Sequence, residues 1–451
     1  MDLRVVNAFG RHVDAPSKWE RFDKREDIIS DLPDYIIGSI LSFLPTKDAV
    51  RTSVLSKRWK NLWKFVTELS FQDRNHLPHR KFKKTHFLHF VYRILIHLSS
   101  STIHSFSLSV YYNYDLSHIN EWISLISDLR VKKICFESQI KQRNFPSNAL
   151  IKCQSLEELI LKNCIITFPP FISLSSLTVL KLSVVTLTCY DLNNSNEPID
   201  LTLTFPVLRK FEIERCAWLS VKSVTLHVPL LEVVSMDCKF VRLNTEFTFC
   251  ASRVTEFMYI GPFFSETIWV DAAHIVSADI TIYDGSNTSL EESILFVSKL
   301  LSINAASLKL CLHEKKVLAR VKRSFNDIPD FQILRHLDLD YATGDFLFDL
   351  LLKSPRLETL VLKVRGDWRL DFAVMPGCLF TLKVVKFVRF AGTPHELNFA
   401  KYVMKNALAL EKITFCSSKL FGSNNCEKLR EKIFSYRTWF SSAVIEFSYI
   451  T

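Results

Sequence analysis

The sequence predicts an α/β protein with a short helical domain at the N-terminus, an irregular solenoid whose strands form a parallel sheet arc, and a C-terminal cap. Residues 27–65 carry apolar side chains at helical spacing. Residues 66–374 repeat a short apolar phrase. Residues 375–451 contain a further amphipathic helix, at 395–409, which is followed by a last copy of the phrase. At 451 residues the chain exceeds one compact core, so several domains or an elongated repeat are expected.

The N-terminal segment is expected to form three short helices. Pro33 suits the first turn of the first helix, and Pro45 ends that helix because an interior proline loses a hydrogen bond. Thr46 and Ser56 are predicted N-caps of the second and third helices. Helices this short depend on packing for stability, so the segment is expected to pack against a partner. Its apolar positions are Ile36, Ile37, Ile40, Leu41, Leu44, Ala49, Val50, Val54, Trp59, Leu62 and Trp63.

These residues resemble the F-box of plant F-box proteins with leucine-rich repeats. The resemblance rests on the ordered set Leu32-Pro33, Ile36, Ile40-Leu41, Leu44-Pro45, residues 49–53, residues 55–59 and Leu62-Trp63. It implies that the segment binds a Skp-family adaptor and, through it, a cullin, so that the chain selects substrates for an SCF-type ubiquitin ligase. The expected adaptor face, or its immediate support, is Leu32, Pro33, Ile36, Ile40, Leu41, Leu44, Val54, Leu55 and Trp59.

The repeated phrase has apolar residues at its first, fourth and sixth positions. Successive copies begin about 21 to 37 residues apart, which overlaps the leucine-rich-repeat period. Residues 261–309 hold only degenerate copies, around Ile280 and Leu308. One strand per repeat is expected to stack into the sheet. The copies cover residues 66–71, 103–108, 131–136, 156–161, 177–182, 208–213, 231–236, 254–259, 334–339, 357–362, 382–387 and 410–415.

The side chains between the buried positions of each strand are expected to face the concave surface, where solenoids usually bind partners. Cys164 and Cys216 follow their strands where leucine-rich repeats place a residue that bonds the turn backbone. We expect an unknown protein substrate to contact the concave surface. Its candidate residues are Lys162, Lys181, Glu212, Glu214, Asp237, His336, Asp338, Asp340 and Lys363.

The C-terminal segment resembles the FBD module of many of these plant proteins, through Cys378-Leu379, Gly392, Glu396-Leu397, Asn406-Ala407 and residues 410–412. Residues 395–409 are predicted to form an amphipathic helix with Leu397, Ala400, Val403, Met404 and Leu408 on one face. Its expected role is to cap the solenoid. The predicted domains are a flexible extension at 1–26, the F-box at 27–65, the solenoid at 66–374 and the FBD-like module at 375–451.

Composition excludes several other classes of protein. The 11 cysteines include no C-x-x-C pair, which disfavours disulfides and zinc sites and favours reduced thiols. The net charge is +10, but residues 101–300 hold 16 basic and 21 acidic side chains, so a continuous nucleic-acid-binding stripe is not expected. No apolar run of about 18 residues predicts a membrane span, and no secretory signal is evident. An intracellular site, nuclear or cytoplasmic, is expected.

No catalytic motif stands out. The chain has 9 glycines and no phosphate-binding loop, and the set His336, Asp338 and Asp340 lacks a nucleophile. The pairs His76/His79 and His86/His89 flank a basic run, which disfavours a metal ion. No enzyme activity, cofactor or metal is predicted. Two alternatives remain open: a non-ligase scaffold and a receptor that senses a small molecule in the arc.

Overall fold

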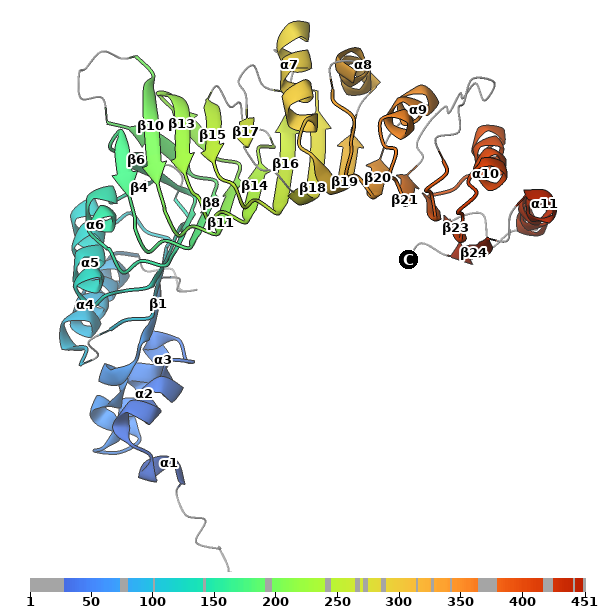
Figure 1. Ribbon diagram of the computed structural model, residues 1–451. Helices are drawn as coiled ribbons and strands as arrows, with labels where there is room; N and C mark the ends of the chain where they lie inside the picture. The colour runs from blue at the N-terminus through green and yellow to red at the C-terminus, as the bar shows by residue number, and fades with distance from the viewer. Residues whose placement is uncertain are drawn as a thin grey trace, which may run out of the picture.

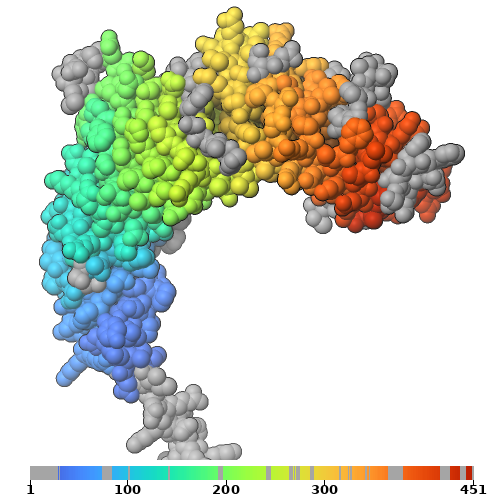
Figure 2. All heavy atoms as spheres, in the orientation of Figure 1, coloured from blue at the N-terminus to red at the C-terminus, as the bar shows by residue number. Residues whose placement is uncertain are grey.

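A computed structural model shows an arch built on one parallel sheet of 15 strands (Figures 1 and 2). The strand order follows the sequence, with the strands of the inserted outer layer left out. The short helices 28–65 lie at one end of the arch and α11 lies at the other (Figure 1). The structure describes residues 28–73, 80–99, 102–140, 143–190, 197–239, 245–263, 268–270, 275–284, 289–313, 315–325, 328–340, 343–363, 379–416, 425–440 and 443–448.

The main sheet confirms the predicted solenoid. All twelve copies of the phrase coincide with strands, and the two degenerate copies coincide with β18 and β19. A fifteenth strand, β24, was not predicted. The strands are β1 (Glu68–Gln72), β2 (Ser105–Val110), β3 (Lys133–Ser138), β5 (Glu158–Lys162), β8 (Val179–Ser183), β11 (Lys210–Glu214), β14 (Val233–Asp237), β16 (Glu256–Pro262), β18 (Ile275–Tyr283), β19 (Ala305–Leu312), β20 (His336–Asp340), β21 (Thr359–Lys363), β22 (Val384–Val388), β23 (Lys412–Cys416) and β24 (Val444–Ser448).

Side chains alternate along these strands as the period of two requires. In β8, Leu180 and Leu182 are buried, while Lys181 between them is half-buried on the opposite face. Leu180 pairs in register with Leu159 of β5 and Phe211 of β11, so equivalent positions form continuous apolar rows. These rows form the core of the solenoid.

The layer outside the sheet changes along the arch. Helices cover both ends of the arch, and short strands cover its middle, between residues 143 and 270 (Figure 1). These strands form a four-stranded sheet, β4 (Arg143–Phe145), β6 (Cys164–Phe168), β9 (Thr186–Cys189) and β12 (Ala217–Leu219), and a five-stranded sheet, β7 (Phe171–Ser173), β10 (Ile199–Thr204), β13 (Val221–His227), β15 (Glu246–Cys250) and β17 (Ile268–Val270). The outer helices are α4 (Arg80–His97), α5 (Leu116–Asp128), α6 (Ser147–Ile151), α7 (Leu290–Leu301), α8 (Lys315–Ser324), α9 (Gly344–Leu352), α10 (Pro394–Asn406) and α11 (Asn425–Phe440).

The N-terminal domain is more finely divided than predicted. It consists of α1 (Ile28–Asp31), α2 (Asp34–Leu41), α3 (Thr46–Arg51) and the 3₁₀ helices η1 (Thr52–Val54) and η2 (Trp59–Phe65). The predicted helix starts were each wrong by one or two residues. Pro33 and Pro45 themselves occupy the N-cap positions of α2 and α3, and Arg58 in place of Ser56 occupies that of η2. The hydroxyl of Thr46 therefore does not cap α3; it accepts a hydrogen bond from the Ser70 N–H at 2.7 Å.

The predicted C-terminal helix is present as α10. Thr393 and Glu396 form a reciprocal capping box at its start. Its end differs from the prediction: the helix stops at Asn406, and Leu408 beyond it is 79% exposed instead of joining the apolar face. α11 and β24 follow, so the last strand of the arch lies beyond the predicted helix and strand.

Candidate functional site

An exposed apolar surface lies on the N-terminal domain. Val54 is 87% exposed and Leu55 is 64% exposed at the end of η1, while Ile40 and Leu44 are 45% and 41% exposed around the end of α2. The end of α2, the loop to α3 and the end of η1 thus present large side chains to solvent. Because soluble proteins seldom expose several large apolar side chains within so short a segment, we take these side chains as a candidate docking surface. We call it the apolar surface.

The other predicted adaptor residues differ in their exposure to solvent. Leu41 is 2% exposed and belongs to the core, so it supports the surface and does not present a side chain to a partner. Pro33 is exposed. Leu32, Ile36 and Trp59 are half-buried.

Two sets of contacts join α2 to η2 in the N-terminal domain. The guanidinium of Arg58 donates to the carboxylate of Asp34 at 3.0 Å and to the Leu32 carbonyl oxygen, which ties the start of η2 to the start of α2. Gly38 of α2 packs directly on η2: a Cβ at Gly38 would lie 2.5 Å from the Phe65 Cβ. The absence of a side chain at this position lets the two helices approach.

Sequence reasoning missed three exposed apolar residues of this domain. Phe43 is 84% exposed, Tyr35 is 64% exposed and Ile29 is 54% exposed. Phe43 lies between Ile40 and Leu44, so the apolar surface includes it. The helical pattern could not single it out, because periodicity predicts which side chains face the core and says little about apolar groups outside it.

A second candidate surface is a hollow of about 420 Å³ on the concave face, across β5, β8, β11, β14 and β16. Five predicted substrate-contact residues line it: Lys162, Lys181, Glu212, Glu214 and Asp237. Their strands are neighbours in register, which brings residues 75 positions apart in sequence to one place. The short side chains of Ser183 and Ser235 leave space between the longer charged ones. We call this site the concave hollow.

Ion pairs hold the middle of the concave hollow. The Glu212 carboxylate accepts from the Nζ atoms of Lys181 at 2.8 Å and Lys210 at 2.7 Å. Partial burial opposes ionisation of Glu212, but the two lysines outweigh it and hold the pKa of its carboxyl below the ordinary value. Glu212 is therefore an ionised, fixed group near neutral pH.

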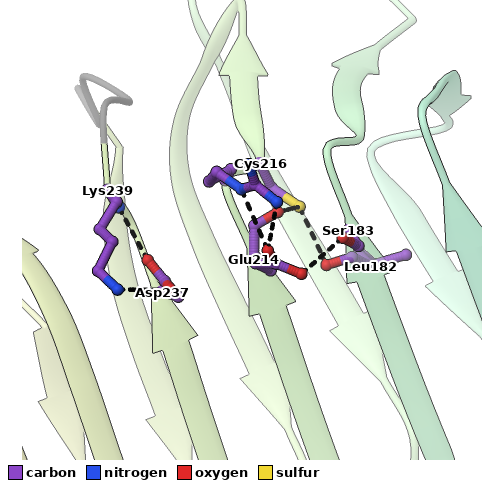
Figure 3. Close-up of polar contacts among 7 residues, drawn as sticks. Leu182, Ser183, Glu214, Cys216, Asp237 and Lys239 are labelled. Carbon is purple, nitrogen blue, oxygen red and sulfur yellow. Dashed lines mark hydrogen bonds and ion pairs between the residues drawn. The ribbon is translucent and has the colours of Figure 1, made fainter.

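At the carboxyl end of the strands, Glu214 and Asp237 are also held (Figure 3). The Ser183 Oγ donates to Glu214 Oε2 at 2.7 Å, and this bond together with Arg215 lowers the pKa of Glu214. Asp237 Oδ1 accepts from the Lys239 N–H at 3.0 Å. Lys162, by contrast, makes no ion pair with any described residue.

Cys216 anchors the turn that follows Glu214, as its position in the repeat predicts. Its Sγ donates to the Leu182 carbonyl oxygen at 3.4 Å, which links neighbouring repeats (Figure 3). Burial raises the pKa of the Cys216 thiol to about 11. The thiol is therefore protonated near neutral pH and has a structural role. Cys216 and eight other cysteines whose side chains the structure describes are free thiols.

The remaining predicted substrate residues do not join the concave hollow. His336, Asp338 and Asp340 lie on β20 and Lys363 on β21, with β16, β18 and β19 between them and β14. Lys363 Nζ pairs with the Asp338 carboxylate at 3.0 Å. The predicted residues thus form two separate groups on one concave face.

Within the described ranges, no group of three or more His, Cys, Asp and Glu side chains could hold a metal ion. His86 and His89 are exposed on α4, and His76 and His79 lie outside the described residues. Among the helices that the structure describes, none combines the length and apolar character needed to span a membrane.

Two segments of the chain match known protein families. Residues 29–69 match the F-box domain family, and residues 373–415 match the FBD family. An F-box/FBD/LRR-repeat protein of Arabidopsis thaliana is 28% identical over 417 residues, covering 86% of this chain and 92% of the relative. From the same organism, a putative FBD-associated F-box protein is 25% identical over 411 residues (87% and 93%). F-box/LRR-repeat protein 13 is 28% identical over 464 residues (93% and 96%).

Proposed function

The chain carries an F-box and an FBD domain and is a distant homologue of the Arabidopsis F-box/FBD/LRR-repeat proteins, and from this premise we propose that it is a substrate receptor of an SCF-type ubiquitin ligase. In this role the F-box docks a Skp-family adaptor and, through it, a cullin. The solenoid holds a target protein. The chain itself performs no chemistry, and its site of action is intracellular.

The observation that carries the proposal is the apolar surface on the F-box. Phe43 and Val54 are more than four-fifths exposed, although both are large apolar side chains on a well-packed domain. Burying such a side chain is worth about 1.5–3 kcal/mol, so covering several together can drive a stable complex. An adaptor with a complementary apolar groove is the partner that this surface fits.

The concave hollow is the proposed contact for the target. Ion pairs fix the carboxylate of Glu212, and hydrogen bonds fix those of Glu214 and Asp237, before any partner arrives, which lowers the ordering cost of binding. Lys162 adds a cation without an ion-pair partner among the described residues. Holding adaptor and target in one assembly raises the effective concentration of target lysines near the ligase and so accelerates ubiquitin transfer.

The proposal is tested by co-purification of full-length protein with a Skp-family adaptor and a cullin. V54E places a charge in the apolar surface and is expected to abolish both interactions, whereas S39A, an exposed change on α2 outside that surface, should retain them. Recovery of the adaptor without any cullin would favour a non-ligase scaffold. Failure of the intact protein to bind the adaptor would refute the receptor role.

A small-molecule-sensing receptor remains the second alternative, because a hollow of about 420 Å³ falls within the range of ligand pockets. Native mass spectrometry of gently purified protein separates this alternative from direct target binding. A retained molecule whose signal is lost in the K181E variant would support a sensor.

A further inference from the structure

The first strand of the main sheet has an edge that the solenoid itself does not cover. Among the strands that the structure describes, β1 pairs with β2 alone. Asp73 donates its N–H to the Ser109 carbonyl oxygen at 3.3 Å, so odd-numbered residues of the strand bond toward β2. Because backbone groups alternate along a strand, Ser70 points its N–H to the open edge. An uncovered edge of this kind lacks hydrogen-bond partners and invites aggregation.

Two hydroxyl groups of the F-box hold the start of this strand: one covers its open edge, and the other binds the residue before it. The Thr46 Oγ1 at the start of α3 accepts the Ser70 N–H at 2.7 Å, and Thr46 is 1% exposed. The Ser42 Oγ, just after α2, accepts the N–H of Thr67, the residue before β1, at 2.9 Å. The same Ser42 hydroxyl donates to the Gly38 carbonyl oxygen at 3.0 Å, which fixes its direction. Both contacts join segments more than 20 residues apart in sequence.

The F-box and the first repeat also share one apolar core. Ile37, Leu41 and Leu62 of the F-box belong to the same buried cluster as Leu69 and Phe71 of β1. The Ser99 N–H, after α4, donates to the Lys64 carbonyl oxygen at 2.9 Å, so the chain returns to η2 after the first repeat. The segment that joins η2 to β1 is therefore held by contacts with both the F-box and the first repeat.

We propose that the F-box is the N-terminal cap of the solenoid and that Ser42 and Thr46 are positioning residues that fix it on the start of β1, Thr46 at the open edge and Ser42 at the residue before the strand. This inference rests on the proposed function for its consequence: an adaptor bound to the apolar surface is held at a fixed orientation to a target in the concave hollow. Both hydroxyls act through the backbone, Thr46 at β1 and Ser42 at the residue before it. Deleting the F-box also uncovers the solenoid core, so a deletion is a poor control for adaptor binding.

The test compares wild type with S42A/T46V, which removes both acceptors. Dyes on non-natural residues at the exposed positions 61 and 276 report the distance distribution between F-box and solenoid, and hydrogen exchange reports the Ser70 amide. We expect S42A/T46V to broaden the distance distribution and to lower protection of the Ser70 amide by about 10-fold or more, since an orphaned buried N–H loses its partner. T46S keeps the hydroxyl and should behave as wild type.

S39A is the matched control for the Ser42 change, because the Ser39 hydroxyl bonds only the Tyr35 carbonyl oxygen of its own helix. If S42A/T46V does not fold, S42A alone should still lower protection of the Thr67 amide while S39A does not. A distance distribution and amide protection equal to wild type in S42A/T46V, or in S42A when only that variant folds, would overturn the inference. Adaptor affinity is measured separately: its absence in wild type refutes the proposed function and leaves the cap test intact.

Discussion

Gly38 provides a prediction whose sign depends on one close contact. A Cβ at this position would lie 2.5 Å from the Phe65 Cβ, 2.9 Å from the Phe65 carbonyl oxygen and 3.0 Å from its carbonyl carbon. Two of these atoms are backbone, so a rotamer change cannot relieve the clash. G38A therefore forces α2 away from η2 and should weaken the F-box.

The magnitude follows from two opposing terms. In an unhindered helix, replacing glycine by alanine stabilises by about 1 kcal/mol. Overpacking a filled interior costs about 1–3 kcal/mol, and the upper half of that range applies when backbone must move. We expect a net destabilisation of about 1–2 kcal/mol, confined to the F-box and β1.

The assay is hydrogen exchange of amides in α2 and η2 of the full-length protein, because a solenoid can unfold locally without a single global transition. S39A, at the neighbouring exposed position, should change these amides by less than about 0.5 kcal/mol. If G38A instead increases the protection of these amides, α2 does not pack closely on η2 at this position, and the higher helix propensity of alanine alone decides the effect.

Three further predictions concern the core and the charged sites. L41A should destabilise the F-box by about 2–5 kcal/mol, because the Leu41 side chain is fully packed. It should weaken adaptor binding only in proportion to the unfolded fraction of the F-box, and calorimetric binding measurements at two temperatures check this. Asp73 is almost fully buried, and burial raises the pKa of its carboxyl. Its contribution to stability is therefore greatest below the pKa of the unfolded chain, about 4, and is lost as pH rises through the pKa of the folded protein. D73N should flatten the pH dependence of amide protection in β1. A wild-type slope of opposite sign would contradict this. E212Q should cost less than about 1 kcal/mol in urea unfolding yet reduce target capture, whereas E291Q on the outer helix α7 should leave capture unchanged.

The sheet could be predicted from sequence because its apolar phrase reports burial directly. Leu337 and Leu339, for example, alternate with charged residues, and only a strand buries both on one side. β24 escaped prediction because the phrase that ends in Ile445 and Phe447 would begin at Ser442, which is polar. Ile445 and Phe447 are also only half-buried, at the end of the arch. The terminal repeat has no neighbour to complete its core.

The outer layer was less accessible to sequence reasoning. The strands over the middle of the arch include β10, whose Leu201 and Leu203 alternate like those of any main-sheet strand. Period two predicts a strand without specifying which sheet it joins, because pairing depends on residues distant in sequence. The sequence therefore did not anticipate two additional sheets.

The candidate sites, too, could be predicted from the sequence only in part. Strand alternation placed Lys181, Glu212 and Asp237 on one face, but only the register of neighbouring strands brings them to one hollow and separates them from Asp338. On the F-box, helical spacing identified Leu41 as readily as Val54, although one is core and the other is exposed. Telling contact from support requires the packing of the helices on each other, which a single sequence does not encode locally.

The most direct test of the receptor role is the affinity of purified full-length protein for a Skp-family adaptor, measured by calorimetry beside V54E, S39A and E212Q. V54E changes a side chain that is 87% exposed, so it should leave the fold intact and weaken binding at least about 100-fold, or about 2.7 kcal/mol. S39A and E212Q should bind as wild type. Equal affinity of V54E and wild type, with both folded, would contradict the assignment of the apolar surface as the docking site.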